Sequence, residues 1–599
     1  MNPLFYGRKK SDTKPLIYHA WDCETRGLGG ELLCITTCPE NPSTTFYYDG
    51  ACAIDAFLEQ AFLYYYTKKE KHVWVSHNMS YDMRYIVEYV INHLGEYEFG
   101  FIGMRTDSLF YAMDLKRKSD NLTIRFVDSF AVFDQKLELF AEQFGGAYKK
   151  LENPEWDERD FDPLNSRDIE YARADSACLK SSIDNYADIV YKEYGVHLGY
   201  TIAGTSLKAW QKTIPEETLY WKPSKKFSDF FREGYYGGLV FLTDTNAHEN
   251  VRSYDINSSY PAQMRKGMPS GNPALTYEYI PSDKQPGFYR CKVKAPDNLR
   301  IPIIPHRSEK GLLLWTRGSF ETVVTNMEID FARKHGYEIE TLEGVIFEGL
   351  EYPCNDFVDK CEAIRKEARK TPREIVAKKH QNALYGKFCT SELRDEIVFK
   401  PLISAEEYMQ FADEGWVPLN SDAQDGPFYV RKTDQSEIVM AMPQWGAWIT
   451  ANGRLTLLRA AYDIGIEYCI YGDTDSITVK KEANVSCLEL SDEYGAWKLD
   501  KEWDTFRAIA PKVYAGMQSN KWAGASKGQN KRYMKEKQYM DIYNEGKTEI
   551  IAPQLESLRQ VLKRGKPLPA HLQDKKTSDI LKNISYELMP DGTTRPKEI

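Results

Sequence analysis

The spacing of hydrophobic positions changes along the chain and predicts a succession of different elements. Residues 16–24 and 122–130 have the apolar, β-branched character of strands, whereas residues 76–91 and 167–191 repeat apolar positions at helical spacing. Alternating strands and helices predict an α/β domain at the start of the chain. A linker at 193–204 is expected to close this domain.

The pattern becomes more varied after residue 235. Strand-like runs come first, followed by a stretch at 267–353 that proline and glycine interrupt. Helices are expected over 354–388, with a break at Thr371-Pro372 because proline cannot continue a helix. Residues 390–432 are acidic and rich in turn formers. The segment 466–480 runs from apolar to acidic to β-branched, which is typical of a hairpin with a functional turn.

Length and composition narrow the class of protein. The 599 residues suffice for about four domains with buried cores. No apolar run reaches the roughly 18 residues of a membrane helix, and the first residues lack the apolar centre of a secretory signal, so we expect a cytoplasmic protein without membrane contact. Eleven cysteines without a CxxC pair argue against a disulfide framework or a structural zinc site.

The charge is unevenly distributed. The chain has 78 basic and 88 acidic residues, a net charge of −10 that by itself argues against a nucleic-acid partner. Residues 362–388 nevertheless hold eight basic residues against three acidic ones, and residues 512–537 hold seven against one. Such stretches are either solvated helix faces or grooves for a polyanion.

A first acidic constellation lies in the N-terminal part. Its carboxylates are Asp22, Glu24, Asp82 and Asp175. Asp22 and Glu24 stand two apart on a predicted strand and so share a face. Asn78 and Asp82 stand four apart, as do Tyr171 and Asp175, and each pair is predicted to share a helix face. Four carboxylates and a tyrosine that orients a water would satisfy two-metal phosphodiester hydrolysis; the alternative is solvated acids on unrelated surfaces.

A second constellation combines SYDINSSYP with YGDTDSITV. Asp255 follows a strand-like run, and Asp473 and Asp475 flank Thr474 at a predicted hairpin tip. Facing acids repel one another unless cations neutralise them. If Asp255 lies opposite Asp475, two Mg²⁺ ions could bridge them and a triphosphate. An isolated Asp255 would instead be an ordinary turn former.

Both basic stretches also carry aromatic residues. In KKHQNALYGKF, Lys378, Asn382 and Tyr385 share one helix face. The segment could be an ordinary amphipathic helix, but a lysine and an aromatic ring on one face fit a binding site for an incoming nucleotide better. The other stretch opens with Lys512-Val513-Tyr514, and Trp522 and Tyr533 are interleaved in it. Basic residues mixed with aromatic ones suit a nucleic-acid strand, although KxY alone is a weak signal.

Taken in order, these motifs resemble those of family B DNA polymerases. WDCET, HNMSYD and YARAD resemble the three exonuclease motifs of proofreading polymerases, and SYDINSSYP, KKHQNALYGK and YGDTDS resemble the polymerase motifs. YYGG at 235–238 resembles the YxGG linker, and KVY resembles the KxY motif. The length and the long spacings beside the basic helix resemble the protein-primed polymerases of phages and linear plasmids. The resemblance spans residues 16–540.

The resemblance implies a multidomain α/β and α+β fold, with an RNase H-like exonuclease domain before a right-hand polymerase domain that carries two insertions. The implied parts are the exonuclease domain at 1–195, palm at 196–266 and 433–545, a first insertion at 267–353 that contacts a terminal protein and duplex, fingers at 354–389, a second insertion at 390–432 for strand displacement and processivity, and a thumb at 546–599.

The same resemblance implies residue roles in the two sites. In the exonuclease, Asp22, Glu24, Asp82 and Asp175 would hold metals, Tyr171 would orient the water, and Thr25, Asn78, Tyr81 and Ser129 would bind the single strand. In the polymerase, Asp255 and Asp475 would hold metals with Asp473 close by. Tyr260, Lys378, Asn382 and Tyr385 would bind the nucleotide, with Tyr260 excluding a 2′-hydroxyl. Tyr235, Gly237, Gly238, Lys512 and Tyr514 would contact DNA.

The implied function is template-directed, strand-displacing DNA synthesis from a protein primer, with 3′→5′ proofreading. Two Mg²⁺ ions per site would serve, with Mn²⁺ as a substitute. The expected partners of this monomer are primer-template DNA, dNTPs, a terminal protein and a single-strand-binding protein. Ser259, Ala383 and Phe130 depart from the usual residues without removing a catalytic group. The alternatives are a polymerase that starts without a protein primer and an inactive DNA-binding relative; an exonuclease alone would leave residues 200–599 without a role.

Overall fold

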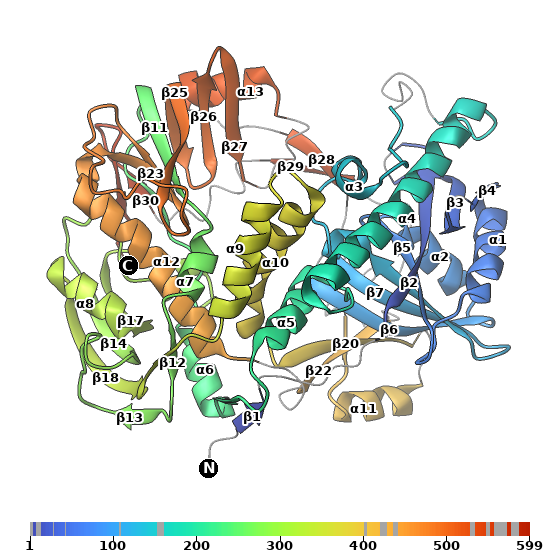
Figure 1. The fold of residues 1–599 in the computed structure, drawn as a ribbon, viewed down its shortest axis with the longest axis horizontal. Coiled ribbons are helices and arrows are strands. Elements are labelled where there is room, and N and C mark those ends of the chain that lie inside the picture. Colours follow the sequence, from blue (N-terminus) through green and yellow to red (C-terminus); the bar gives the residue numbers. More distant parts are fainter. Residues whose placement is uncertain are drawn as a thin grey trace.

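Two seven-stranded sheets lie at opposite ends of the molecule, with helices between them (Figure 1). The computed structural model of the protein describes residues 4–6, 14–27, 29–41, 43–106, 109–152, 161–400, 404–419, 428–434, 441–527, 534–546, 551–555, 572–576 and 586–598. Among these residues, no helix combines the length and the apolar character needed to cross a membrane.

The N-terminal sheet has the strand order β4-β3-β2-β5-β8-β7-β6. Its strands are β2 (Leu16–Thr25), β3 (Leu32–Glu40), β4 (Ser43–Tyr48), β5 (Lys71–Ser76), β6 (Tyr97–Thr106), β7 (Leu109–Arg117) and β8 (Thr123–Asp128). The central strands β2, β5 and β8 run parallel, while the outer pairs are antiparallel. The helices around this sheet are α1 (Gly50–Leu63), α2 (Met83–Asn92), α3 (Leu137–Phe144) and α4 (Ser166–Tyr194). The predicted α/β start of the chain is therefore confirmed.

Two of the expected N-terminal elements have different limits. The predicted helix at 76–91 begins only at Met83, because Ser76 still belongs to β5 and Asn78 has a φ of 66°, which no α-helix accommodates. The prediction that Asn78 and Asp82 share a helix face is therefore wrong. The predicted strand at 122–130 ends at Asp128, whose side chain caps the short 3-10 helix η1 (Ser129–Ala131).

The second large sheet is antiparallel, with the order β10-β23-β24-β11-β25-β26-β27. Its strands are β10 (Val240–Leu242), β11 (His248–Ile256), β23 (Cys469–Asp473), β24 (Ser476–Val479), β25 (Trp497–Ala510), β26 (Val513–Gln518) and β27 (Lys521–Ser526). The hairpin predicted at 466–480 is formed by β23 and β24. The nearby helices are α7 (Ser259–Met264), α12 (Pro443–Ile464) and α13 (Glu536–Glu545), with η2 (Ile466–Tyr468) before β23.

Smaller units surround this sheet. A four-stranded sheet, β13 (Ala274–Thr276), β18 (Glu338–Ile346), β14 (Gly287–Ala295) and β17 (Gly318–Thr325), carries α8 (Asn326–Lys334). Short pairs are formed by β1 (Leu4–Tyr6) with β9 (Leu219–Trp221), β12 (Met268–Ser270) with β19 (Gly349–Glu351), β15 (His306–Arg307) with β16 (Leu313–Leu314), and β28 (Ile551–Leu555) with β29 (Leu572–Lys576). The hairpin of β30 (Tyr586–Leu588) and β31 (Thr594–Pro596) packs on the second large sheet, where Thr594 N–H donates to the Thr243 carbonyl and the Tyr586 hydroxyl donates to that of Val240.

The segment 390–432, expected to be rich in turns, contains regular elements. These are β20 (Leu393–Phe399), α11 (Ala405–Asp413), β21 (Val417–Pro418) and the start of β22 (Phe428–Asp434). The strands form one three-stranded sheet, and Phe399 and Phe428 pack on Phe99 of β6.

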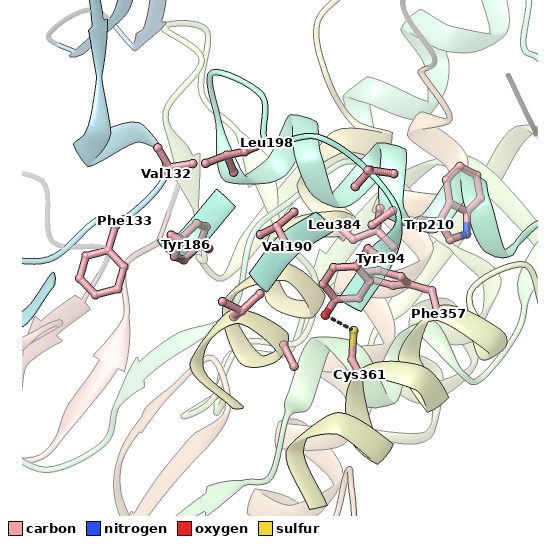
Figure 2. Packing of buried hydrophobic residues seen from close by; sticks show 14 of the residues in the cluster. Val132, Phe133, Tyr186, Val190, Tyr194, Leu198, Trp210, Phe357, Cys361 and Leu384 are labelled. Carbon is pink, nitrogen blue, oxygen red and sulfur yellow. Dashed lines mark hydrogen bonds between the residues drawn. The ribbon is translucent and has the colours of Figure 1, made fainter. Parts of the chain in front are cut away.

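A helical core joins the two halves of the molecule. It is built by α4, α5 (Ile202–Thr213), α9 (Asn355–Glu367), α10 (Pro372–Phe388) and α12, and α6 (Lys225–Glu233) lies nearby. The break predicted at Thr371-Pro372 is confirmed, because Pro372 begins α10. Figure 2 shows Tyr194 of α4 beside Phe357 and Cys361 of α9, where the Tyr194 hydroxyl and Cys361 Sγ are 3.3 Å apart, while Tyr186 lies toward Phe133. Helix α4 thus connects the N-terminal sheet to the α9–α10 hairpin.

Candidate active sites: two acidic centres

The first acidic centre forms where α4 crosses the N-terminal sheet. Asp22 and Glu24 alternate with buried Trp21 and Cys23 on β2, so both project from the same face, and α4 brings Asp175 to them. One carboxylate oxygen from each of these three residues lies within 4.8 Å of the others. Asp82 lies next to this group and accepts the N–H of Cys23 at 3.2 Å. The four predicted carboxylates are therefore neighbours, with Asp82 at the edge.

Burial and mutual repulsion disfavour the charged form of these carboxylates unless a cation is bound. Burial first, and then the charge of Asp175, raise the pKa of Asp22 to about 7. Burial and Asp22 also raise the pKa of Glu24 and of Asp82. Three oxygen donors that repel one another in a buried setting are the donor set that a hard divalent cation prefers. The residues present therefore fit Mg²⁺.

One residue of this centre was missed from the sequence. Lys150 forms an ion pair with Asp175 and lies 5.0 Å from the ring centroid of Tyr171. Burial and Asp175 raise the pKa of Tyr171 to about 12, with Lys150 opposing the shift, so its hydroxyl remains a proton donor. The Lys149-Lys150 doublet is visible in the sequence, but no spacing rule connects it to Asp175.

The residues assigned to the single strand fall into two pairs. The hydroxyls of Thr25 and Tyr81 are hydrogen bonded, and Gly29 N–H donates to Tyr81 at 3.3 Å. Asn78 N–H donates to Asp128, directly before Ser129. Ser129 is fully buried and donates to the Ser76 carbonyl at 3.1 Å. Thr25 and Tyr81 therefore border the acidic centre, while Asn78 and Ser129 meet around the 3-10 turn.

The second acidic centre lies on the other large sheet. Asp255 near the end of β11 pairs in register with Ser476, and Ile256 N–H donates to the Asp475 carbonyl at 2.8 Å. Asp473 and Asp475 flank Thr474, whose φ of 61° produces the tight turn between β23 and β24. Burial, Asp255 and Asp473 together raise the pKa of Asp475 to about 6. The predicted proximity of Asp255 and Asp475 is thus realised.

Lysine side chains form ion pairs with the other two acids of this centre, Asp473 and Asp255. Lys512 Nζ lies 2.9 Å from Asp473 Oδ2, and Lys498 Nζ lies 3.7 Å from Asp255 Oδ1. Lys498 was missed from the sequence, where it stands on β25 directly across from Asp255. In the part of the chain that the structure describes, only the first centre brings three acidic ligands within 4.8 Å of one another. The second centre is looser, and its oxygen donors likewise suit Mg²⁺.

The YYGG segment packs against the acidic turn. A Cβ at Gly238 would lie 2.5 Å from Thr474 Oγ1, whereas one at Gly237 would meet nothing within 4 Å. Thr474 N–H donates to the Leu239 carbonyl at 2.8 Å. Arg454, missed from the sequence, donates to the Gly237 carbonyl at 3.0 Å. Tyr235 is largely buried, which raises its pKa, with Tyr385 and Tyr260 contributing.

Helix α10 presents the predicted nucleotide face beside this centre. Lys378 and Asn382 are exposed, and the ring of Tyr385 stacks on that of Tyr260 with centroids 4.2 Å apart. Lys378 lies close enough to lower the pKa of Asp255, although burial raises it overall. Tyr514 lies farther back, packed against Tyr471 with centroids 5.6 Å apart.

Comparisons with known proteins show which proteins this chain and its fold resemble. Residues 148–415 match the model of the family described as DNA polymerase type B, organellar and viral. The fold is that of a phage DNA polymerase: Phi29 DNA polymerase complexed with primer-template DNA superimposes with a TM-score of 0.70 over 94% of this chain and 100% of that chain, at 17% identity. Its ternary complex with incoming nucleotide substrates gives 0.71 over 93% and 99%, also at 17% identity.

Relatives known by sequence agree with this class. A probable DNA polymerase of Neurospora intermedia is 26% identical over 406 residues, which are 63% of this chain and 39% of that protein. The DNA polymerase of human adenovirus E serotype 4 is 26% identical over 207 residues, 30% of this chain and 17% of that protein. The chain thus spans about two fifths or less of these relatives' lengths. The resemblance to type B DNA polymerases is confirmed.

Proposed function

We propose that this protein is a DNA-directed DNA polymerase that adds dNTPs to a primer 3′-hydroxyl and trims mispaired ends with a 3′→5′ exonuclease. The observation that carries the proposal is the meeting of Asp255, Asp473 and Asp475 with the exposed face of α10. Those parts come from three segments that lie more than 80 residues apart in the sequence. Acids opposite a lysine and an aromatic ring suit a metal-bound triphosphate beneath a base pair.

In the polymerase centre, Asp255 and Asp475 would hold two Mg²⁺ ions, with Asp473 and Lys512 beside them. Bound Mg²⁺ lowers the pKa of the attacking hydroxyl and stabilises the charge on the leaving phosphate. Lys378 would bind the triphosphate, and Asn382 the nucleotide. Tyr385 would pack on the nascent base pair while Tyr260 blocks a 2′-hydroxyl. Tyr235, Gly237, Gly238 and Tyr514 would contact DNA.

In the N-terminal centre, Asp22, Glu24, Asp82 and Asp175 would hold the metals of the exonuclease. The protonated hydroxyl of Tyr171 would orient the attacking water, and Lys150 would hold Asp175 in place. Thr25, Tyr81, Asn78 and Ser129 would bind the single strand. This role is supported by the tight acidic cluster, which has no use in a protein that only binds DNA.

The finer assignments belong to the same proposal. We assign 1–195 to the exonuclease, 354–389 to the fingers and 546–599 to a thumb, and we assign terminal-protein contact to 267–353. Residues 390–432 would separate strands ahead of the polymerase centre. Initiation would use a terminal protein, and a single-strand-binding protein would assist.

The first experiment is primer extension by purified protein with Mg²⁺ and dNTPs. Wild-type protein should extend the primer, and Asp475→Ala should not. Asp504→Ala, an exposed acid on β25, is the matched control and should extend normally. Equal extension by Asp475→Ala and wild type would show that the metal site is assigned wrongly.

A second experiment tests initiation and strand displacement. On unprimed DNA, products formed without a terminal protein would contradict protein priming. On a primed circular template, the protein should make products longer than the circle, and deletion of 390–432 should shorten them. Products of equal length from the deletion variant would refute the proposed role of that segment.

A further inference from the structure

A closed ring of hydrogen bonds lies at the base of the α9–α10 hairpin. Arg365 of α9 donates through Nη1 to Ser258 Oγ and to the Tyr494 hydroxyl, both at 2.7 Å. The Tyr494 hydroxyl donates to Gln381 Oε1 at 2.9 Å, and Gln381 Nε2 lies 3.5 Å from Ser258 Oγ. Four side chains from α9, α10, the turn after β11 and the segment before β25 are thus joined.

The ring is sheltered from solvent and costly to break. Gln381 is fully buried, and the other three side chains are partly buried. The Arg365 guanidinium also lies 5.2 Å from the ring centroid of Tyr494. Removing the Tyr494 hydroxyl would leave Gln381 Oε1 without its donor and take one acceptor from Arg365, and buried groups without partners are penalised.

Two members of the ring, Ser258 and Gln381, are close neighbours in sequence of residues in the proposed nucleotide site. Ser258 lies between Asp255 and Tyr260 and has a φ of 48°, a left-handed conformation that a serine keeps only where its surroundings hold it. Gln381 directly precedes Asn382 on α10. The segment after Tyr494 is bound to the same turn, because Gly495 N–H donates to the Asn257 carbonyl at 2.8 Å.

A second group of polar side chains joins α9 to the end of α7. Arg265, directly after α7, pairs with Asp359 and Glu362 of α9, and its guanidinium lies 5.2 Å from the ring centroid of Tyr494. That cluster holds α9 beside the end of α7 and packs on the ring of Tyr494, but it makes no use of the Tyr494 hydroxyl. The ring differs because it links the fingers face directly to the Asp255–Tyr260 turn.

We propose that Tyr494 is a positioning residue that sets the α10 face against the Asp255–Tyr260 turn and thereby determines the affinity for the incoming dNTP. The inference rests on the proposed polymerase function. Tyr494 acts through Arg365, Gln381 and Ser258 and does not touch the nucleotide. Loss of its hydroxyl leaves the catalytic acids in place, so nucleotide binding weakens while the chemical step is retained.

The test is single-nucleotide incorporation by Tyr494→Phe. We expect KM for dNTP to rise about fivefold to tenfold, the size of one or two lost hydrogen bonds, with kcat within about twofold of wild type. Gln381→Met should have a similar effect, and the double variant should add little, because both changes break the same ring. Tyr462→Phe is the matched control, since it removes a hydroxyl that donates to the Ile301 carbonyl at 3.1 Å away from the ring.

The outcomes separate this inference from the proposed function. If wild-type protein extends primers and Tyr494→Phe keeps the wild-type KM, or loses only kcat, the positioning role is wrong. If wild-type protein incorporates no nucleotide, the proposed function is wrong. Hydrogen exchange then still tests the ring: Tyr494→Phe, unlike Tyr462→Phe, should lose protection in α10, and unchanged protection would overturn the inference.

Discussion

The two acidic centres bring like charges together in different ways. At the first, three carboxylates converge within 4.8 Å between β2 and α4, and Lys150 pairs with Asp175. At the second, the acids lie on adjacent strands, and Lys498 and Lys512 lie beside Asp255 and Asp473. The pKa of Asp22 is raised to about 7, whereas that of Asp475 reaches only about 6.

The difference indicates what each centre accommodates. A tight, buried cluster suits the end of one strand and depends on cations to offset its repulsion. The second centre is more exposed, with the Asp255 side chain about one-third exposed, and so leaves room for a triphosphate, a primer end and a template. Substitutions that act on one centre and spare the other are therefore the sharpest tests of the comparison.

The largest effect is expected from Asp175→Asn. Losing one of three converging carboxylates should reduce degradation of labelled single-stranded DNA by at least about 10²-fold, because the metal site loses a charged ligand. Primer extension should be unchanged. Asp188→Asn, on the exposed side of α4 where it pairs with Lys192, should leave both activities intact. A loss of extension in Asp175→Asn would mean that the two centres are not independent.

Gly238→Ala should damage the second centre alone. Its new Cβ would lie 2.5 Å from Thr474 Oγ1, and such overpacking costs about 1–3 kcal/mol, so the acidic turn should shift and extension should fall about tenfold or more. Gly95→Ala, outside both centres, also adds a Cβ that meets nothing within 4 Å and is the control for steric effects. Equal extension rates for the two variants would contradict the close packing of Gly238 on the turn.

Lys150→Met should impair the first centre by a smaller amount. Without its cation, Asp175 is less well held, and we expect degradation of single strands to slow about tenfold, as for loss of one charged hydrogen bond. Lys149→Met changes an exposed neighbour and should have no effect. Identical rates for both variants would refute a role for Lys150.

The smallest effect concerns the core between the centres, where His380 of α10 is fully buried near Tyr186 and Ser206. Burial lowers its pKa from 6.5 to about 3. Below pH 6.5, His380 binds a proton in the unfolded chain but not in the folded protein. The free energy of unfolding is therefore highest above pH 6.5 and falls as the pH decreases. By pH 5 the loss is about 2 kcal/mol.

Urea unfolding at pH 7.5 and pH 5 measures this loss. His380→Gln should lower stability at pH 7.5 and show a smaller further decrease at pH 5 than wild type. His335→Gln, which changes a partly buried histidine outside this core, is the control. An equal pH dependence in wild type and His380→Gln would show that His380 is not the group responsible.

Much of the fold and of the sites could be predicted from local patterns. Residues two apart on one face predict the strand that holds Asp22 and Glu24, and residues four apart predict the helix that holds Tyr171 and Asp175. The turn-forming residues around Thr474 predict the hairpin. The helix break at Pro372 follows from the missing N–H of proline. These features depend on neighbours within a few residues, so the sequence displays them directly.

Contacts across the chain could not be predicted in this way. Lys150 beside Asp175 and Lys498 beside Asp255 belong to no spacing pattern. The helix expected at 76–91 was extended too far because Asn78 adopts a left-handed conformation, which its amide hydrogen bond to Asp128 helps to hold. Local helix propensity does not reveal a hydrogen-bond partner that lies 50 residues away in the sequence.

The amino-acid sequence by itself determined which side chains are available and which short stretches are strand, helix or turn, because backbone geometry repeats every two to four residues. Only the tertiary structure decided that Asp22, Glu24 and Asp175 share a buried site while Asp255, Asp473 and Asp475 form a more exposed one. It also decided that Tyr494 closes a ring of hydrogen bonds with Arg365, Gln381 and Ser258. Charge repulsion, burial and hydrogen bonding depend on distance in space, and only the folded chain sets that distance.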